Sequence, residues 1–138
     1  MATYLADKSA LARVETCPEV SMVLDPLLLE GEVATCAMID LEVLYSARSP
    51  DTYAALARYL RSLPRVHVTE AVVDRALEVQ SRLAMRSRHY GVRFPDLLIA
   101  ACAESADLTV MHYDADYERI AEVTGQPVQW VVPRGSVD

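Results

Sequence analysis

The feature that most constrains the fold is an apolar run that begins directly after a proline and an aspartate. Pro95 and Asp96 precede residues 97–103, which are almost wholly apolar. A run of this composition predicts a helix that is buried on most of its surface and lies centrally in the fold. Asp96 is then the N-cap of this helix, a carboxylate presented at the mouth of the fold, or both.

Short β-prone segments alternate with helical segments along the rest of the chain. The predicted strands are residues 3–6, 32–36, 66–68, 108–111 and 128–131. Besides the apolar helix, the predicted helices are residues 9–14, 18–29, 39–47, 51–62, 116–124, and a long one from Thr69 or Glu70 to about Arg88. This alternation favours an α/β fold with a mainly parallel sheet and helices on both faces. The 138 residues fit one domain, residues 1–138.

Acidic residues follow several of these predicted elements. Asp7 follows the first predicted strand, and Asp114 follows the fourth, at the sheet edge where ligands bind in open parallel sheets. Taken singly, Asp7, Asp96, Asp114 and Asp116 are ordinary helix caps, and Glu42 complements a helix dipole. The coincidence of several acids at one rim favours a shared site.

Clustered carboxylates repel one another unless a cation lies between them. A site of oxygen ligands without Cys or His suits Mg²⁺ or Mn²⁺. Such a cation polarises a phosphoryl oxygen and makes bound water more acidic. The pattern therefore favours phosphodiester cleavage and does not choose the substrate.

Composition narrows the class of protein. The chain is 52% hydrophobic and 24% charged, as expected for a soluble globular domain. Its net charge of −7 argues against a simple basic nucleic-acid binder, but it suits a carboxylate cluster or a basic protein partner. We expect no membrane span, signal peptide, disulfide framework or zinc site, and a cytoplasmic location, because apolar runs are short and the three cysteines are widely spaced.

Four blocks of the sequence resemble the PIN domain in their order and separation. They are residues 4–11, with Asp-Lys-Ser-Ala-Leu after an apolar strand; the glutamate helix at 41–44; Phe-Pro-Asp-Leu-Leu-Ile-Ala-Ala at 94–101; and residues 112–121. Together with the chain length, they resemble the VapC toxins of bacterial VapBC toxin–antitoxin pairs. Lys8 replaces a residue that is usually small or polar, and His112 stands where Thr or Ser is common; these departures concern the fine geometry of the site and not the class.

This resemblance implies a three-layer α/β/α sandwich around a mainly parallel sheet of four or five strands. It also implies a toxin with Mg²⁺- or Mn²⁺-dependent endoribonuclease activity. The protein would form a homodimer and would be neutralised by a VapB-type antitoxin in a heterotetramer or larger assembly.

The resemblance also implies roles for individual residues. The catalytic acids are Asp7, Glu42, Asp96 and Asp114, and the metal ligands are Asp7, Asp96, Asp114 and Asp116, with Asp114 and Asp116 partly interchangeable. Glu42 is a ligand or the base toward the attacking water. Ser9 would support the first carboxylate, or a bound water, through its hydroxyl.

Two weaker signals concern binding surfaces. Arg86 and Arg93 belong to a basic stretch that would contact the RNA backbone, or would simply be a solvated helix end. Three tyrosines and a leucine would line a groove for an antitoxin helix, or would serve ordinary packing or a dimer seam: Tyr45, Tyr53, Tyr59 and Leu60.

Two other functions fit parts of the pattern. A catalytically inactive PIN-like binding module would keep the fold without metal turnover, although the acidic set is intact. An aspartate phosphotransfer domain would also place Asp7 after the first strand. Its dehalogenase form needs a second Asp where this chain has Ser9, and its receiver form needs a Lys near the last strand, whereas the chain has no Lys after position 8.

Overall fold

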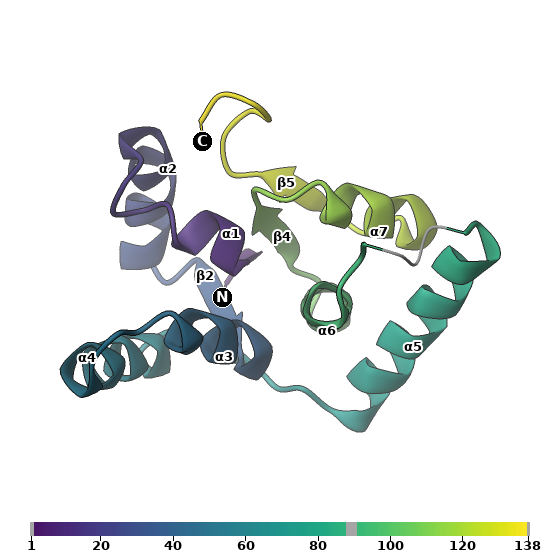
Figure 1. The fold of residues 1–138 in the computed structure, drawn as a ribbon, viewed down its shortest axis with the longest axis horizontal. Coiled ribbons are helices and arrows are strands. Elements are labelled where there is room, and N and C mark those ends of the chain that lie inside the picture. Colours follow the sequence, from purple (N-terminus) through teal and green to yellow (C-terminus); the bar gives the residue numbers. More distant parts are fainter. Residues whose placement is uncertain (1, 88–90, 138) are drawn as a thin grey trace.

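The core of the fold is a parallel sheet of five strands (Figure 1). The computed structural model describes residues 2–87 and 91–137. The strands are β1 (Tyr4–Ala6), β2 (Val33–Cys36), β3 (Arg65–Val66), β4 (Thr109–His112) and β5 (Val128–Trp130). Each pairing in the order β3-β2-β1-β4-β5 is parallel, which confirms the predicted sheet.

The strand order reverses at the central strand. From β1 the chain moves outward through β2 to β3, then returns to the other side of β1 for β4 and β5. In open α/β sheets such a reversal leaves a crevice outside the carboxyl ends of the strands. Asp7 directly follows the carboxyl end of β1, so the strand order places an acid beside this crevice.

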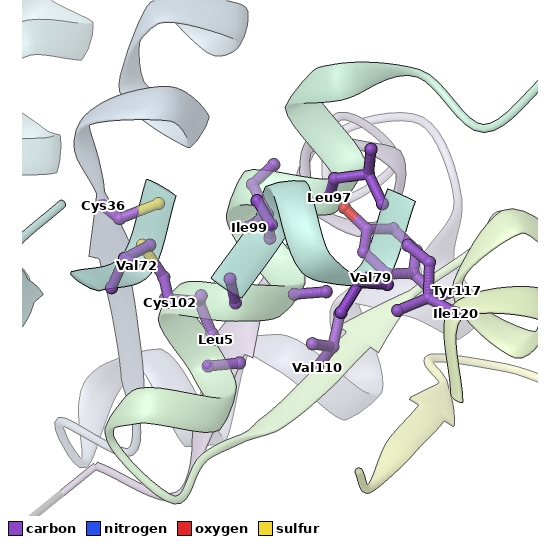
Figure 2. Packing of buried hydrophobic residues seen from close by; sticks show 14 of the residues in the cluster. Leu5, Cys36, Val72, Val79, Leu97, Ile99, Cys102, Val110, Tyr117 and Ile120 are labelled. Atoms are coloured by element: carbon purple, nitrogen blue, oxygen red, sulfur yellow. The ribbon is translucent and has the colours of Figure 1, made fainter. Parts of the chain in front are cut away.

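Helices cover both faces of the sheet. They are α1 (Lys8–Leu11), α2 (Pro18–Leu29), α3 (Ala37–Tyr45), α4 (Pro50–Arg61), α5 (Glu70–Met85), α6 (Phe94–Ser105) and α7 (Asp116–Thr124). Strand side chains alternate: Leu5 and Val110 join the core formed with α5, α6 and α7 (Figure 2), whereas Ala6 and Met111 join the core formed with α1 and α2. This confirms the three-layer sandwich.

Helix α6 is the buried helix predicted from the apolar run. Eight of its twelve residues are buried, and several are small, which lets neighbouring elements approach closely. The N-cap is Arg93, so the prediction that Asp96 caps the helix is wrong. Pro95 fits the first turn because it needs no backbone N–H partner there, and the helix therefore begins before Asp96. Asp96 is the third helical residue.

Some element boundaries differ from the prediction. Strand β3 ends at Val66, since its partner β2 ends at Cys36 and leaves His67 and Val68 without a strand to pair with. Helix α5 ends at Met85, before the predicted end at Arg88, which lies outside the described residues. Within residues 2–87 and 91–137, no helix is both long and apolar enough to cross a membrane.

Candidate metal centre

Five acidic side chains meet at the carboxyl edge of the sheet, and we call them the acidic centre. One oxygen from each of Asp7, Glu42 and Asp96 lies within 4.8 Å of the others, and the same holds for Asp96, Asp114 and Asp116. Asp96 belongs to both groups because α6 points its first turn at this edge. The structure thus brings together all five acids predicted from the sequence.

Asp7 and Asp96 are the most deeply buried members of the acidic centre, with 4% and 6% of their surface exposed. Asp7 Oδ2 accepts the backbone N–H of Ser9 at 2.9 Å, which caps α1 as predicted. Asp7 Oδ1 accepts the hydroxyl of Tyr117 at 2.8 Å, and the same hydroxyl lies 3.4 Å from Asp96 Oδ1. The hydrogen-bond donors to these two acids among the described residues, a backbone amide and a phenol, are therefore both neutral.

Ser9 supports Asp7 in a different way from the predicted one. Its backbone N–H, not its hydroxyl, bonds the carboxylate. The hydroxyl oxygen accepts the N–H of Tyr113 at 2.9 Å and so ties α1 to the segment after β4. The structure thus shows the amide of Ser9, and not its hydroxyl, bonded to Asp7. A hydroxyl contact with a bound water stays a prediction.

Each of the three outer acids, Glu42, Asp114 and Asp116, contacts an arginine or a backbone N–H. Arg93 approaches Glu42 at 3.5 Å, and Arg119 forms an ion pair with Asp116. Asp114 Oδ1 accepts the N–H of Asp116 at 2.9 Å, in the turn that leads into α7. The N-cap of α7 is Ala115, so Asp116 is the first helical residue and not a cap. An acid in this first turn still complements the helix dipole.

Burial and mutual repulsion disturb the ionisation of the acidic centre. Burial, followed by the charges of Asp7 and Asp114, raises the pKa of Asp96 to about 7. Burial and the charge of Asp7 raise the pKa of Glu42, and burial and the charge of Asp114 raise the pKa of Asp116. A divalent cation would relieve this repulsion. The all-oxygen donor set fits Mg²⁺ or Mn²⁺.

A layer of aromatic rings supports the acidic centre. His112 is fully buried, and its Nδ1 accepts the N–H of Asp114 at 3.1 Å, which assigns the ring hydrogen to Nε2. Within the described residues Nε2 has no hydrogen-bond partner, although Glu118 lies 3.5 Å away. Burial lowers the pKa of His112, so the ring is neutral. His112 is therefore a buried core residue with only one ring nitrogen hydrogen-bonded among the described residues.

Tyr117 is the residue of this site that sequence reasoning missed. It is the largest fully buried side chain and packs its ring 5.1 Å from the ring of His112. Its position three residues after Asp114, in the first turn of a helix at the acidic edge, is the signal that would have found it. A buried phenol needs a polar partner for its hydroxyl.

The predicted binding residues separate into two regions. Arg93 lies at the rim of the acidic centre, whereas Arg86 is exposed beyond the end of α5. A groove of about 520 Å³ between α1, α2, α3 and α4 is lined by Tyr59 and Leu60, but not by Tyr45 or Tyr53, which are exposed elsewhere on α3 and α4. The groove wall is mainly apolar and includes Leu11, Leu28, Val43 and Leu56.

Comparisons with known proteins agree with this architecture. The PIN domain model matches residues 4–123. Ribonuclease VapC21 of Mycobacterium tuberculosis is 46% identical over 134 residues, 96% of either chain, and ribonuclease VapC51 of the same species is 44% identical over 98% of this chain and 97% of its own.

Solved structures show the same fold at lower sequence identity. DNA-bound VapBC from Salmonella typhimurium contains a chain with a TM-score of 0.76 at 15% identity, which covers 96% of this chain and all of that one. VapBC-5 from Mycobacterium tuberculosis gives 0.65 at 22% identity, over 94% of this chain and 99% of that one. The chain thus belongs to the PIN domain family and, within it, to the VapC proteins.

Proposed function

We propose that this protein is a Mg²⁺- or Mn²⁺-dependent endoribonuclease toxin that acts in the cytoplasm and is neutralised by a VapB-type antitoxin. One observation carries the proposal: five carboxylates from separate parts of the chain converge on the binding edge of the sheet. The ribonucleases VapC21 and VapC51, which are similar over nearly the whole chain, support RNA as the substrate.

The acids would divide the chemistry between them. The cation would be held by Asp7, Asp96, Asp114 and Asp116. Asp7 and Asp96 are the buried acids, and the carboxylate oxygens of Asp114 and Asp116 lie close to Asp96. A bound Mg²⁺ or Mn²⁺ would polarise the phosphodiester and increase the acidity of the attacking water. Glu42 would be a further ligand or would accept the proton of that water, and its raised pKa makes it a stronger base than an ordinary carboxylate.

Substrate would approach from the exposed rim. Arg93 is 70% exposed beside Glu42, which places a cation where an RNA phosphate would arrive. Arg86 would extend this contact along the RNA backbone. In-line attack by the water would leave a 5′-phosphate and a 3′-hydroxyl.

The antitoxin would dock as a helix in the apolar groove. The apolar side chains that line this groove suit the apolar face of an amphipathic helix, as in other helix-in-groove complexes. Lys8 and Val43 also line the groove, and each directly adjoins a member of the acidic centre, Asp7 or Glu42. A basic extension of the helix would therefore reach the acids. The solved VapBC complexes support such a partner, and we also propose a homodimer that joins the antitoxin in a heterotetramer or larger assembly.

The proposal is tested by incubating total cellular RNA with the purified protein, with Mn²⁺, with Mg²⁺ and with a chelator. We expect discrete metal-dependent fragments that disappear in Asp96→Asn, at a loss of more than about 100-fold. Adding the cognate antitoxin should suppress cleavage. Metal binding without cleavage of any RNA would favour the inactive binding module. Phosphorylation by acetyl phosphate without RNA cleavage would favour the phosphotransfer alternative.

A further inference from the structure

The ring of Tyr117 would be equally well buried if it carried no hydroxyl. The side chain is fully buried in α7 and belongs to the core that contains Leu97 and Ile120 (Figure 2). A Phe ring would fill the same apolar space, and a buried hydroxyl costs free energy unless it is hydrogen-bonded. The hydroxyl therefore needs an explanation that core packing does not give.

The hydroxyl has one proton and two acidic neighbours. Tyr117 Oη lies 2.8 Å from Asp7 Oδ1 and 3.4 Å from Asp96 Oδ1, so the shorter contact takes the proton. Asp7 Oδ2 accepts the N–H of Ser9. Each oxygen of Asp7 thus accepts one hydrogen bond from a group fixed in the fold, which sets the orientation of the carboxylate plane.

The donor is neutral, and this matters for a cation site. A Lys or Arg in the same place would fix Asp7 but would also offset the charge that attracts a cation. A phenol fixes the carboxylate and leaves its charge intact. The same hydroxyl lies 3.4 Å from Asp96, on α6, so it stands between two acids that are distant in sequence and close in space.

We propose that Tyr117 is a positioning residue of the acidic centre, whose hydroxyl orients Asp7 to receive a divalent cation. The inference rests on the proposed function, because it assigns a role within the same metal centre. Groups that orient metal ligands typically contribute 10- to 100-fold to metal affinity or activity.

The test compares Tyr117→Phe with Tyr113→Phe. Both changes remove one hydroxyl from a bonded tyrosine. The Tyr113 hydroxyl bonds Gly135 and Val137 near the C-terminal end of the chain, away from the carboxylates. Mn²⁺ affinity is measured by isothermal titration calorimetry. Circular dichroism and thermal unfolding without metal check that each variant is folded.

We expect Tyr117→Phe to bind Mn²⁺ about 10- to 100-fold more weakly and Tyr113→Phe to bind it like the wild type. The Mn²⁺ concentration for half-maximal RNA cleavage should rise by a similar factor, with a smaller change in the rate at saturating Mn²⁺. Equal Mn²⁺ affinity in Tyr117→Phe and wild type would overturn the inference while leaving the metal centre in place. A wild type that binds no Mn²⁺ would overturn both.

Discussion

The inner and outer acids of the same centre are held in different ways. Asp7 and Asp96 are buried and, among the described residues, bond a hydroxyl and a backbone amide but no cationic side chain. Glu42 and Asp116 are partly exposed, and each lies beside an arginine. Negative charge is therefore left uncompensated inside, where a cation would bind, and is compensated at the rim, where substrate would arrive.

The energetic cost of the two arrangements also differs. An exposed ion pair contributes on the order of 1 kcal/mol or less, so the rim arginines separate easily from their partners. Burial, and then the charges of Asp7 and Asp114, oppose the ionisation of Asp96 and raise its pKa. A cation bound beside Asp96 would favour its charged form and offset this cost.

The largest expected effect concerns the stability of the metal-free protein. With a pKa near 7 in the folded state and an ordinary value of 3.8, Asp96 keeps a proton between about pH 4 and 7 that the unfolded chain has lost. The free energy of unfolding should therefore fall as pH rises through this window, by at most about 1.4 kcal/mol per pH unit from this group. Asp96→Asn should lack this component and should be more stable than wild type at pH 8.

Urea unfolding in chelator at several pH values measures this difference. Asp74→Asn, at an exposed position on α5, removes the same charge away from the acidic centre and serves as the control. Mn²⁺ at pH 8 should stabilise the wild type and not Asp96→Asn. Parallel pH profiles for wild type and Asp96→Asn would show that Asp96 does not hold the proton.

A smaller effect should distinguish the two rim acids from each other. A carboxylate oxygen of Glu42 lies close to oxygens of both inner acids, Asp7 and Asp96. Asp116 instead forms an ion pair with Arg119 and has Asp114 beside it. We expect Glu42→Gln to slow single-turnover RNA cleavage by about 100-fold and Asp116→Asn by about tenfold. If Asp116→Asn slowed cleavage more than Glu42→Gln, then Asp116, and not Asp114, would be the principal acid next to α7.

The sequence predicted the fold and the acids better than it predicted their support. Period and composition identify α6 as buried, and strand ends locate Asp7 and Asp114, because these signals are local. The position of Tyr117 after Asp114 indicates only that it lies near the acidic edge; its bond to Asp7 spans 110 residues and depends on tertiary packing, so the sequence does not show which acid it contacts. The prediction that Asp96 caps α6 was wrong for a related reason. Asp and Pro both favour the start of a helix, and only the structure shows at which residue the helix begins.

The smallest expected effect concerns Arg93 at the rim. Arg93→Gln removes a cation that is 70% exposed, so its pair with Glu42 contributes little to stability, and Mn²⁺ affinity should change by less than about threefold. If Arg93 meets an RNA phosphate, KM should rise several-fold, and the salt dependence of RNA binding should weaken by about one unit of slope. Arg61→Gln, at an exposed position in the last turn of α4, is the matched control. An unchanged salt dependence in Arg93→Gln would mean that Arg93 only pairs with Glu42. The difference between inner and outer acids would then matter for cation binding and not for substrate binding.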